Sequence, residues 1–139
     1  MRRICWAFVS FCLFCAACPL AVAANNVYLT DAIRNSTYLN ALTNLLHSAG
    51  KLPPWTQQLL NPTGDYVGNP AAYSTVDGAK YELFYTCMAH ECDNNELEVM
   101  FAPGGAQAWG ALVVDGKTAS YLGDPSPAQQ AALKAAMQQ

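Results

Sequence analysis

A hairpin with a cysteine at each end of its loop is predicted within residues 80–101, KYELFYTCMAHECDNNELEVMF. Residues 80–86 and 97–101 have the aromatic and aliphatic composition of strands. Fully extended, the chain would hold the Cα atoms of the two cysteines roughly 17 Å apart, whereas a disulfide requires about 4.4–6.8 Å. A bond between them would therefore fold the intervening residues into a tight projecting loop. The loop residues are Cys87, Met88, Ala89, His90, Glu91 and Cys92.

Further strands are predicted on both sides of this hairpin. Residues 72–76 alternate in polarity, and Asp77-Gly78 predicts a tight turn that joins them to the strand at 80–86. Another strand is predicted at residues 108–114, and Asp115-Gly116 predicts a second turn into a strand at 117–122. The middle of the chain is thus expected to form an antiparallel meander of about five strands.

Helices are predicted before and after the strands. Leucines recur at helical spacing from residue 36 to residue 48, and Gly50 follows as a stop signal. Trp55 is expected to anchor a short helical turn through residue 60, and Ser126 is a good cap for a closing helix that runs to about residue 137. This order predicts an α+β domain, with the helices packed on one face of the sheet and the cysteine loop protruding at an edge.

The first 23 residues have the three regions of a secretory signal peptide. A basic start and an apolar core precede Ala21-Val22-Ala23, which is a small-x-small cleavage site. We therefore expect residues 1–23 to be removed on export to the periplasm, which leaves residues 24–139 as one domain. The alternative is lipid attachment at Cys18, because the residues before it partly resemble a lipoprotein cleavage box.

The composition of the exported domain limits its partners. Four of the six cysteines lie in the signal peptide, so Cys87 and Cys92 remain, most simply as a structural disulfide in an oxidising compartment. Without Arg2 and Arg3, five basic residues stand against ten acidic ones, a formal net charge of −5. Such a surface disfavours nucleic acid and anionic membranes and attracts a basic partner. We expect no stable membrane insertion.

Catalytic interpretations have less support than recognition. A thiol enzyme would need a free thiolate, and a redox pair usually has two residues between its cysteines rather than four. His47, His90 and the two cysteines lack the spacing of a zinc site, so we predict no metal and no cofactor. Glu96 and Glu98 resemble the acid and base of a hydrolase, but alternation puts both on one strand face, which we interpret as solvated. A small cell-envelope thiol or hydrolytic enzyme stays as an alternative.

His90 is a candidate recognition residue. A protonated imidazole donates hydrogen bonds from both nitrogens, so a rigid loop that carries it suits insertion between two acidic groups in the cleft of another protein. A side chain already fixed in its binding pose also loses less entropy on association. The competing interpretation is an exposed loop residue beside a stabilising disulfide.

Several short motifs extend beyond the loop. They are Cys-x-x-His-Glu-Cys at 87–92, Asn-x-Leu-x-Val-Met-Phe at 95–101, Trp-Gly at 109–110, Tyr-Leu at 38–39, Gly-Lys-Leu-Pro-x-Trp at 50–55 and Asp-Gly-Lys at 115–117. Together they resemble the Ivy family, the bacterial periplasmic inhibitors of vertebrate lysozyme, over most of the exported domain.

The resemblance implies a non-enzymatic inhibitor with an antiparallel sheet and helices. Its disulfide-closed loop would enter the active-site cleft of C-type lysozyme, a basic muramidase, where His90 would hydrogen-bond the catalytic carboxylates. Glu91 takes the place of the usual Asp, and Met88-Ala89 stands where the family commonly has Lys-Pro. The loss of a cation and of a rigid proline is expected to weaken attraction to an acidic cleft and to loosen the loop.

Other partners remain open. Some members of the family are implicated in restraining the bacterium's own lytic transglycosylases, whose catalytic site also contains an acidic residue, and dimerisation occurs in the family, so a homodimer is compatible with the resemblance. An envelope binding module that uses the same loop for a different partner is a further alternative.

Overall fold

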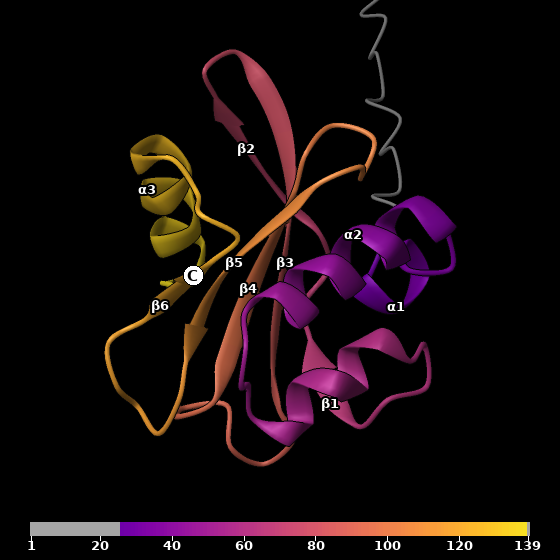
Figure 1. The fold of residues 1–139 in the computed structure, drawn as a ribbon, viewed down its shortest axis with the longest axis vertical. Helices are drawn as coiled ribbons and strands as arrows, with labels where there is room; N and C mark the ends of the chain where they lie inside the picture. The colour runs from indigo at the N-terminus through magenta and orange to yellow at the C-terminus, as the bar shows by residue number, and fades with distance from the viewer. Residues whose placement is uncertain (1–25, 139) are drawn as a thin grey trace, which may run out of the picture.

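The computed structural model describes residues 26–138, which form one antiparallel sheet with helices packed against it (Figure 1). The predicted signal peptide and Cys18 lie outside the described residues. The helices are, in chain order, α1 (Leu29–Ala32), α2 (Ser36–Ser48), the 3-10 helix η1 (Pro54–Leu60) and α3 (Pro127–Ala136). The strands are β1 (Tyr66–Gly68), β2 (Ala72–Val76), β3 (Ala79–Met88), β4 (Glu96–Phe101), β5 (Ala108–Val113) and β6 (Ser120–Leu122). Within residues 26–138, every helix is too short or too polar to span a membrane.

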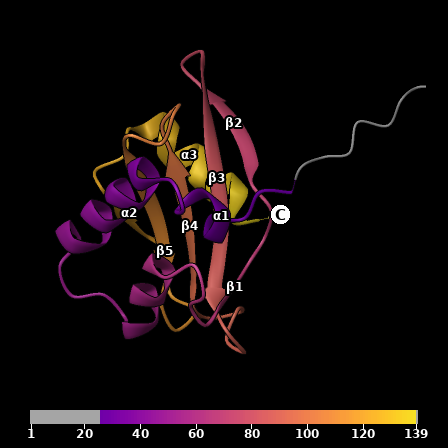
Figure 2. The same cartoon turned by 90° about the vertical axis from the view of Figure 1, so that its right-hand side faces the viewer.

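β3 is the longest strand, and its two ends have different neighbours. The order across the sheet is β1-β3-β4-β5-β6, and β2 pairs with β3 on the same side as β1. Residues 72–76 of β2 pair with residues 79–83, whereas residues 66–68 of β1 pair with residues 86–88. Figure 2 shows the β2–β3 hairpin at one end of β3 and the connection to β4 at the other end. The cysteine loop therefore lies at the end of β3 opposite the hairpin.

Most of the predicted elements are confirmed, and the differences concern two short strands. The Asp77-Gly78 turn has the positive φ values, 50° and 81°, that this two-residue hairpin requires. β1 adds a strand where none is predicted, so the sheet has six strands. The Asp115-Gly116 turn forms as predicted, with the backbone N–H of Lys117 donating to Val114 O at 3.1 Å. β6 is nevertheless shorter than predicted, because the chain after this turn is irregular until Ser120, which pairs with Leu112.

The two faces of the sheet carry separate hydrophobic clusters. Phe84 and Val99 pack with α1, α2 and η1, whereas Leu83 and Met100 pack with Leu133 of α3. The fold is α+β as predicted, but α3 covers the face opposite the other helices, so the expectation that all helices share one face is corrected. The reason lies in β4, where every residue after the first is buried. A strand that is buried on both sides needs cover on both faces of the sheet.

α2 has the predicted bounds and leads the chain toward the cysteine loop. The Asn35 side chain caps it by accepting a hydrogen bond from the Thr37 backbone N–H at 2.9 Å, and Gly50 follows its end with φ 77°. Its buried residues are Ala41, Leu42, Leu45 and Leu46. Each buried leucine contributes about 1.5–3 kcal/mol, more than the roughly 1 kcal/mol of a cap, so packing dominates. His47 is exposed in the last turn.

Candidate functional site

The loop between β3 and β4 brings the six predicted site residues together. Cys87 lies near the end of β3, is fully buried and is bonded to Cys92, with the two Cα atoms 4.9 Å apart. The predicted disulfide is confirmed. In the chain-entropy account, a ring of this size stabilises the fold by about 2 kcal/mol. Its larger effect is geometric, because it holds the four intervening residues at one end of the sheet.

The backbone between the cysteines forms a hydrogen-bonded turn. The Glu91 N–H donates to Met88 O at 3.0 Å, which makes Ala89 and His90 the two central residues. His90 has φ 68°, whereas Ala89 has no positive φ, and this is the pattern of a type II turn. The Met88 N–H donates to Asn95 O at 2.9 Å, so the strand pairing continues to the base of the turn. The loop is thus fixed by backbone hydrogen bonds as well as by the disulfide.

His90 stands at the exposed tip of this turn in the left-handed region of backbone conformation. A residue with a Cβ atom is disfavoured there by about 1–2 kcal/mol relative to glycine. A turn of this type usually has glycine or asparagine at this position. A strained residue held at an exposed tip points to a role for its side chain rather than for its backbone.

A hollow of about 470 Å³ flanks the loop. Met88 and Glu91 line it from the loop, Trp55 lines it from η1, and Asp115 lines it from the β5–β6 connection. The Gly116 N–H donates to Asn94 O at 2.9 Å, which ties that connection to the loop. The surface that could meet another protein therefore comprises three segments that lie apart in the sequence, and residue chemistry alone identifies only the loop among them.

The charge around the loop is mainly negative. Glu91, Asp93 and Asp115 are exposed there. The Lys117 ammonium lies 3.6 Å from the Asp115 carboxylate, but both side chains are more than two-thirds exposed, and such surface pairs contribute roughly 0–1 kcal/mol. The surface around the imidazole is therefore suited to a basic protein.

Glu96 and Glu98 lie on the same face of β4, as predicted, but the interpretation of that face as solvated is wrong for Glu98. Only 1 % of the Glu98 surface is exposed. α3 covers this face of the sheet, a placement that the periodicity of β4 does not encode. Burial, with a smaller contribution from the Glu96 charge, raises the pKa of Glu98 to about 8. The sequence signal that could have found this site is Met100, an apolar residue on the face assigned to solvent.

Among residues 26–138, no cluster of three or more His, Cys, Asp or Glu side chains is placed to hold a metal ion. The two histidines are in different parts of the fold, His47 at the end of α2 and His90 in the cysteine loop. The chemistry that the loop offers is thus hydrogen bonding by one exposed imidazole. No known family model matches the sequence, and no curated protein matches it either.

Proposed function

We propose that this chain is a periplasmic, non-enzymatic inhibitor of C-type lysozyme, which occludes the active-site cleft with residues 87–92. The observation that carries the proposal is the presentation of His90 at the tip of a disulfide-closed turn, exposed and in a left-handed conformation. An imidazole in this position can donate to two carboxylates at once when it is protonated. A muramidase cleft contains such a pair of acidic groups.

The rigidity and the charge of the loop support this proposal. Because the turn is closed before binding, fewer torsions have to be ordered in the complex, and each flexible side chain that is ordered costs about 0.5–1.5 kcal/mol. The acidic residues around the loop favour association with a basic muramidase. Export through residues 1–23 would bring the protein to a compartment in which the disulfide is stable.

The disulfide weighs against the thiol-enzyme alternative. Cys87 is fully buried and bonded to Cys92, so neither sulfur is a free thiolate as nucleophilic catalysis requires. Titration of free thiols in the native exported protein tests this point directly. Two reactive thiols per chain would favour the enzyme over the inhibitor.

A turbidity assay tests the proposed function. Lysis of a bacterial cell-wall suspension by C-type lysozyme is followed with and without the oxidised protein, and then with the protein after reduction of its disulfide. We expect the oxidised protein to inhibit lysis and the reduced protein to inhibit it less, because the loop loses its fixed shape. Lysis at an unchanged rate with the oxidised protein would refute the proposal.

The same assay distinguishes the alternative targets. A lytic transglycosylase replaces lysozyme in a parallel series, because its acidic catalytic residue could accept the same imidazole. Inhibition of the transglycosylase alone would assign the loop to control of the bacterium's own enzymes. Failure to inhibit either enzyme would favour an envelope binding module with another partner. The apparent mass in solution, with and without lysozyme, tests for a homodimer.

A further inference from the structure

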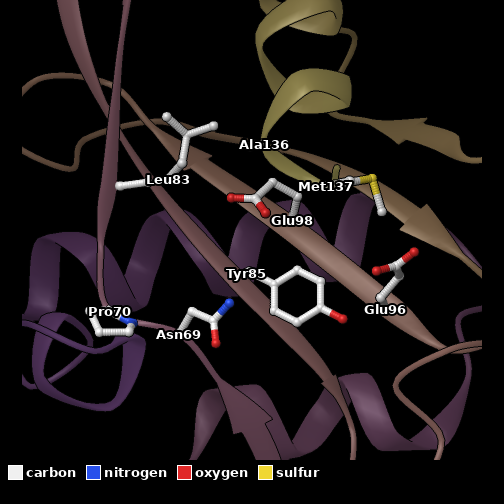
Figure 3. A pocket seen from close by; sticks show the side chains of 9 residues that line it. Asn69, Pro70, Leu83, Tyr85, Glu96, Glu98, Ala136 and Met137 are labelled. Atoms are coloured by element: carbon white, nitrogen blue, oxygen red, sulfur yellow. The ribbon is translucent and has the colours of Figure 1, made fainter. Parts of the chain in front are cut away.

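A second site lies on the α3 face of the sheet, apart from the tip of the cysteine loop. Figure 3 shows a pocket bounded by β3, β4 and the C-terminal end of α3, with the segment at residues 69–70 at its edge. Its volume is about 380 Å³. The polar side chains that line it are those of Asn69, Tyr85, Glu96 and Glu98. This is large enough for a small organic group.

Glu98 is the central polar residue of this pocket. It is 1 % exposed, and its Oε2 atom has no hydrogen-bond partner among the described residues. In Figure 3 its carboxyl group lies between the side chains of Leu83 and Met137. A buried acceptor without a partner destabilises a fold by about 1–3 kcal/mol. An apolar side chain at this position would avoid that penalty, so the carboxyl group itself points to a ligand.

The wall beside Glu98 adds further acceptors. Glu96 lies two residues earlier on the same face of β4, and Tyr85 lies opposite Glu98 on β3. Burial raises the pKa of Tyr85 to about 12, with a smaller contribution from the nearby Glu96 carboxylate. No Lys, Arg or His is among the residues that line the pocket. The pocket is therefore rich in acceptors and has no positive charge of its own.

We propose that this pocket binds an organic cation, either a primary ammonium or a guanidinium group. Glu98 would accept one of its N–H groups and Glu96 another, while Leu83 and Met137 would contact an aliphatic stem. Two carboxylates are too few for the six to eight oxygen ligands of Ca²⁺, and no set of three ligand side chains occurs in residues 26–138. An organic cation fits the donors and the apolar walls better than a metal ion does.

The cation could be a free amine or guanidine, or a Lys or Arg side chain of a protein partner. Glu96 pairs directly with Cys87 across the sheet, so the pocket adjoins the base of the cysteine loop. A basic protein held by that loop would therefore have its side chains within reach of the pocket. This second source rests on the proposed function, whereas binding of a free cation does not.

Binding is expected to depend on pH because Glu98 must lose its proton to pair with the cation. The groups that face it are Glu96 from β4, Tyr85 from β3 and Asn69 from the β1–β2 connection, and α3 contributes only the neutral Ala136 and Met137. The pKa of Glu98 is about 8, so the carboxyl is mainly protonated at pH 6.5 and mainly ionised at pH 8.5. Affinity should therefore rise with pH across this interval, with release of about one proton at the lower pH.

Titration with n-butylguanidinium and with n-butylammonium, followed by amide chemical shifts at pH 6.5 and 8.5, tests the proposal. We expect saturable shifts concentrated at the residues that line the pocket, and an affinity roughly twentyfold higher at pH 8.5 than at pH 6.5. Glu98→Gln should weaken binding and remove its pH dependence, and Glu96→Gln should weaken binding while the pH dependence stays. Absence of saturable shifts, or equal binding by Glu98→Gln in its folded state, would overturn the inference.

A competition experiment separates the two sources of the cation. If a lysozyme side chain fills the pocket, saturation with lysozyme should prevent n-butylguanidinium binding, and Glu98→Gln should weaken the complex. If the ligand is a free cation, lysozyme and n-butylguanidinium should be able to bind the protein at the same time. If the oxidised protein does not inhibit lysozyme, the proposed function is refuted, but the small-cation titration is unaffected. If it inhibits lysozyme but binds no cation, only this second site is refuted.

Discussion

At the scale of single residues, a substitution of His90 tests the contribution of the imidazole to inhibition with little effect on the stability of the loop. His90→Gly suits the left-handed backbone better but makes the unfolded chain more flexible, so stability should change by less than about 1 kcal/mol. Inhibition should weaken by at least about tenfold, because each lost hydrogen bond to a charged group contributes about 1.5–3 kcal/mol. The inhibition constant and the thermal unfolding midpoint are the two measurements. His47→Ala, at the other and also exposed histidine, is the control, and equal inhibition by His90→Gly would remove the imidazole from the contact.

A substitution at Ala89, the residue before His90, is expected to strengthen the lysozyme complex rather than weaken it. Ala89 is the first central residue of the type II turn, where proline is favoured because its fixed φ matches the turn. Ala89→Pro should therefore stabilise the protein by about 0.4–1 kcal/mol through the unfolded state. Because the loop is then more rigid, the dissociation rate of the lysozyme complex should fall a few-fold. Urea unfolding and surface-binding kinetics check the two effects, and a faster dissociation would show that the bound loop adopts a different turn.

Glu98 makes stability depend on pH in the sense opposite to most carboxyl groups. Its pKa is raised from the ordinary value of 4.5 to about 8, so the folded protein holds a proton that the unfolded chain releases between these values. The free energy of unfolding should therefore fall as pH rises from 4.5 to 8, by an amount on the order of a few kcal/mol, and stay level above pH 8. Glu98→Gln should remove this slope in urea unfolding across that range, whereas the exposed Glu91→Gln should keep it.

At the scale of elements, the parts that follow from sequence are those with local signals. α2 follows from its leucine spacing and Gly50, and the β2–β3 hairpin follows from Asp77-Gly78. β1 has only three residues, which is too few for alternation to be recognised, and it exists because it pairs with the end of β3. The placement of α3 on the second face is set by long-range packing against Leu83 and Met100, for which the chain carries no local signal.

The docking of α3 depends on one residue more than on any other. Leu133 is fully buried and is the only α3 residue in the buried cluster on that face. Leu133→Ala should lower the free energy of unfolding by about 2–5 kcal/mol, through lost burial and the cavity that remains. The neighbouring Lys134→Ala, at an exposed position, should change it by less than about 0.5 kcal/mol. Urea unfolding of both variants is the measurement, and a small effect of Leu133→Ala would show that α3 contributes little to the core.

At the scale of the whole molecule, the sequence predicts one of the two candidate sites, the cysteine loop, but not the other, the pocket around Glu98. The six loop residues are contiguous, so their chemistry and the disulfide are visible in the chain itself. The pocket around Glu98 is assembled from β3, β4 and α3, and a strand carboxylate looks solvated until the helix that covers it is placed. The Pro53–Trp55 segment and Asp115 flank the loop for the same long-range reason.

The net charge of residues 24–139 gives the last prediction, which concerns the rate of association. Residues 24–139 carry a formal charge of −5, so attraction to a basic lysozyme should accelerate encounter at low salt. The screening length falls from about 10 Å at 0.1 M salt to about 3 Å at 1 M. The association rate constant should therefore fall by about tenfold over this range, while the dissociation rate constant, set by the short-range contacts of the bound loop, changes little. Stopped-flow measurements at several salt concentrations check both constants. His90→Gly is the matched comparison, because the fall in association rate with salt should persist while its dissociation is faster at every concentration. An association rate that does not respond to salt would place the contact away from the acidic surface around the loop.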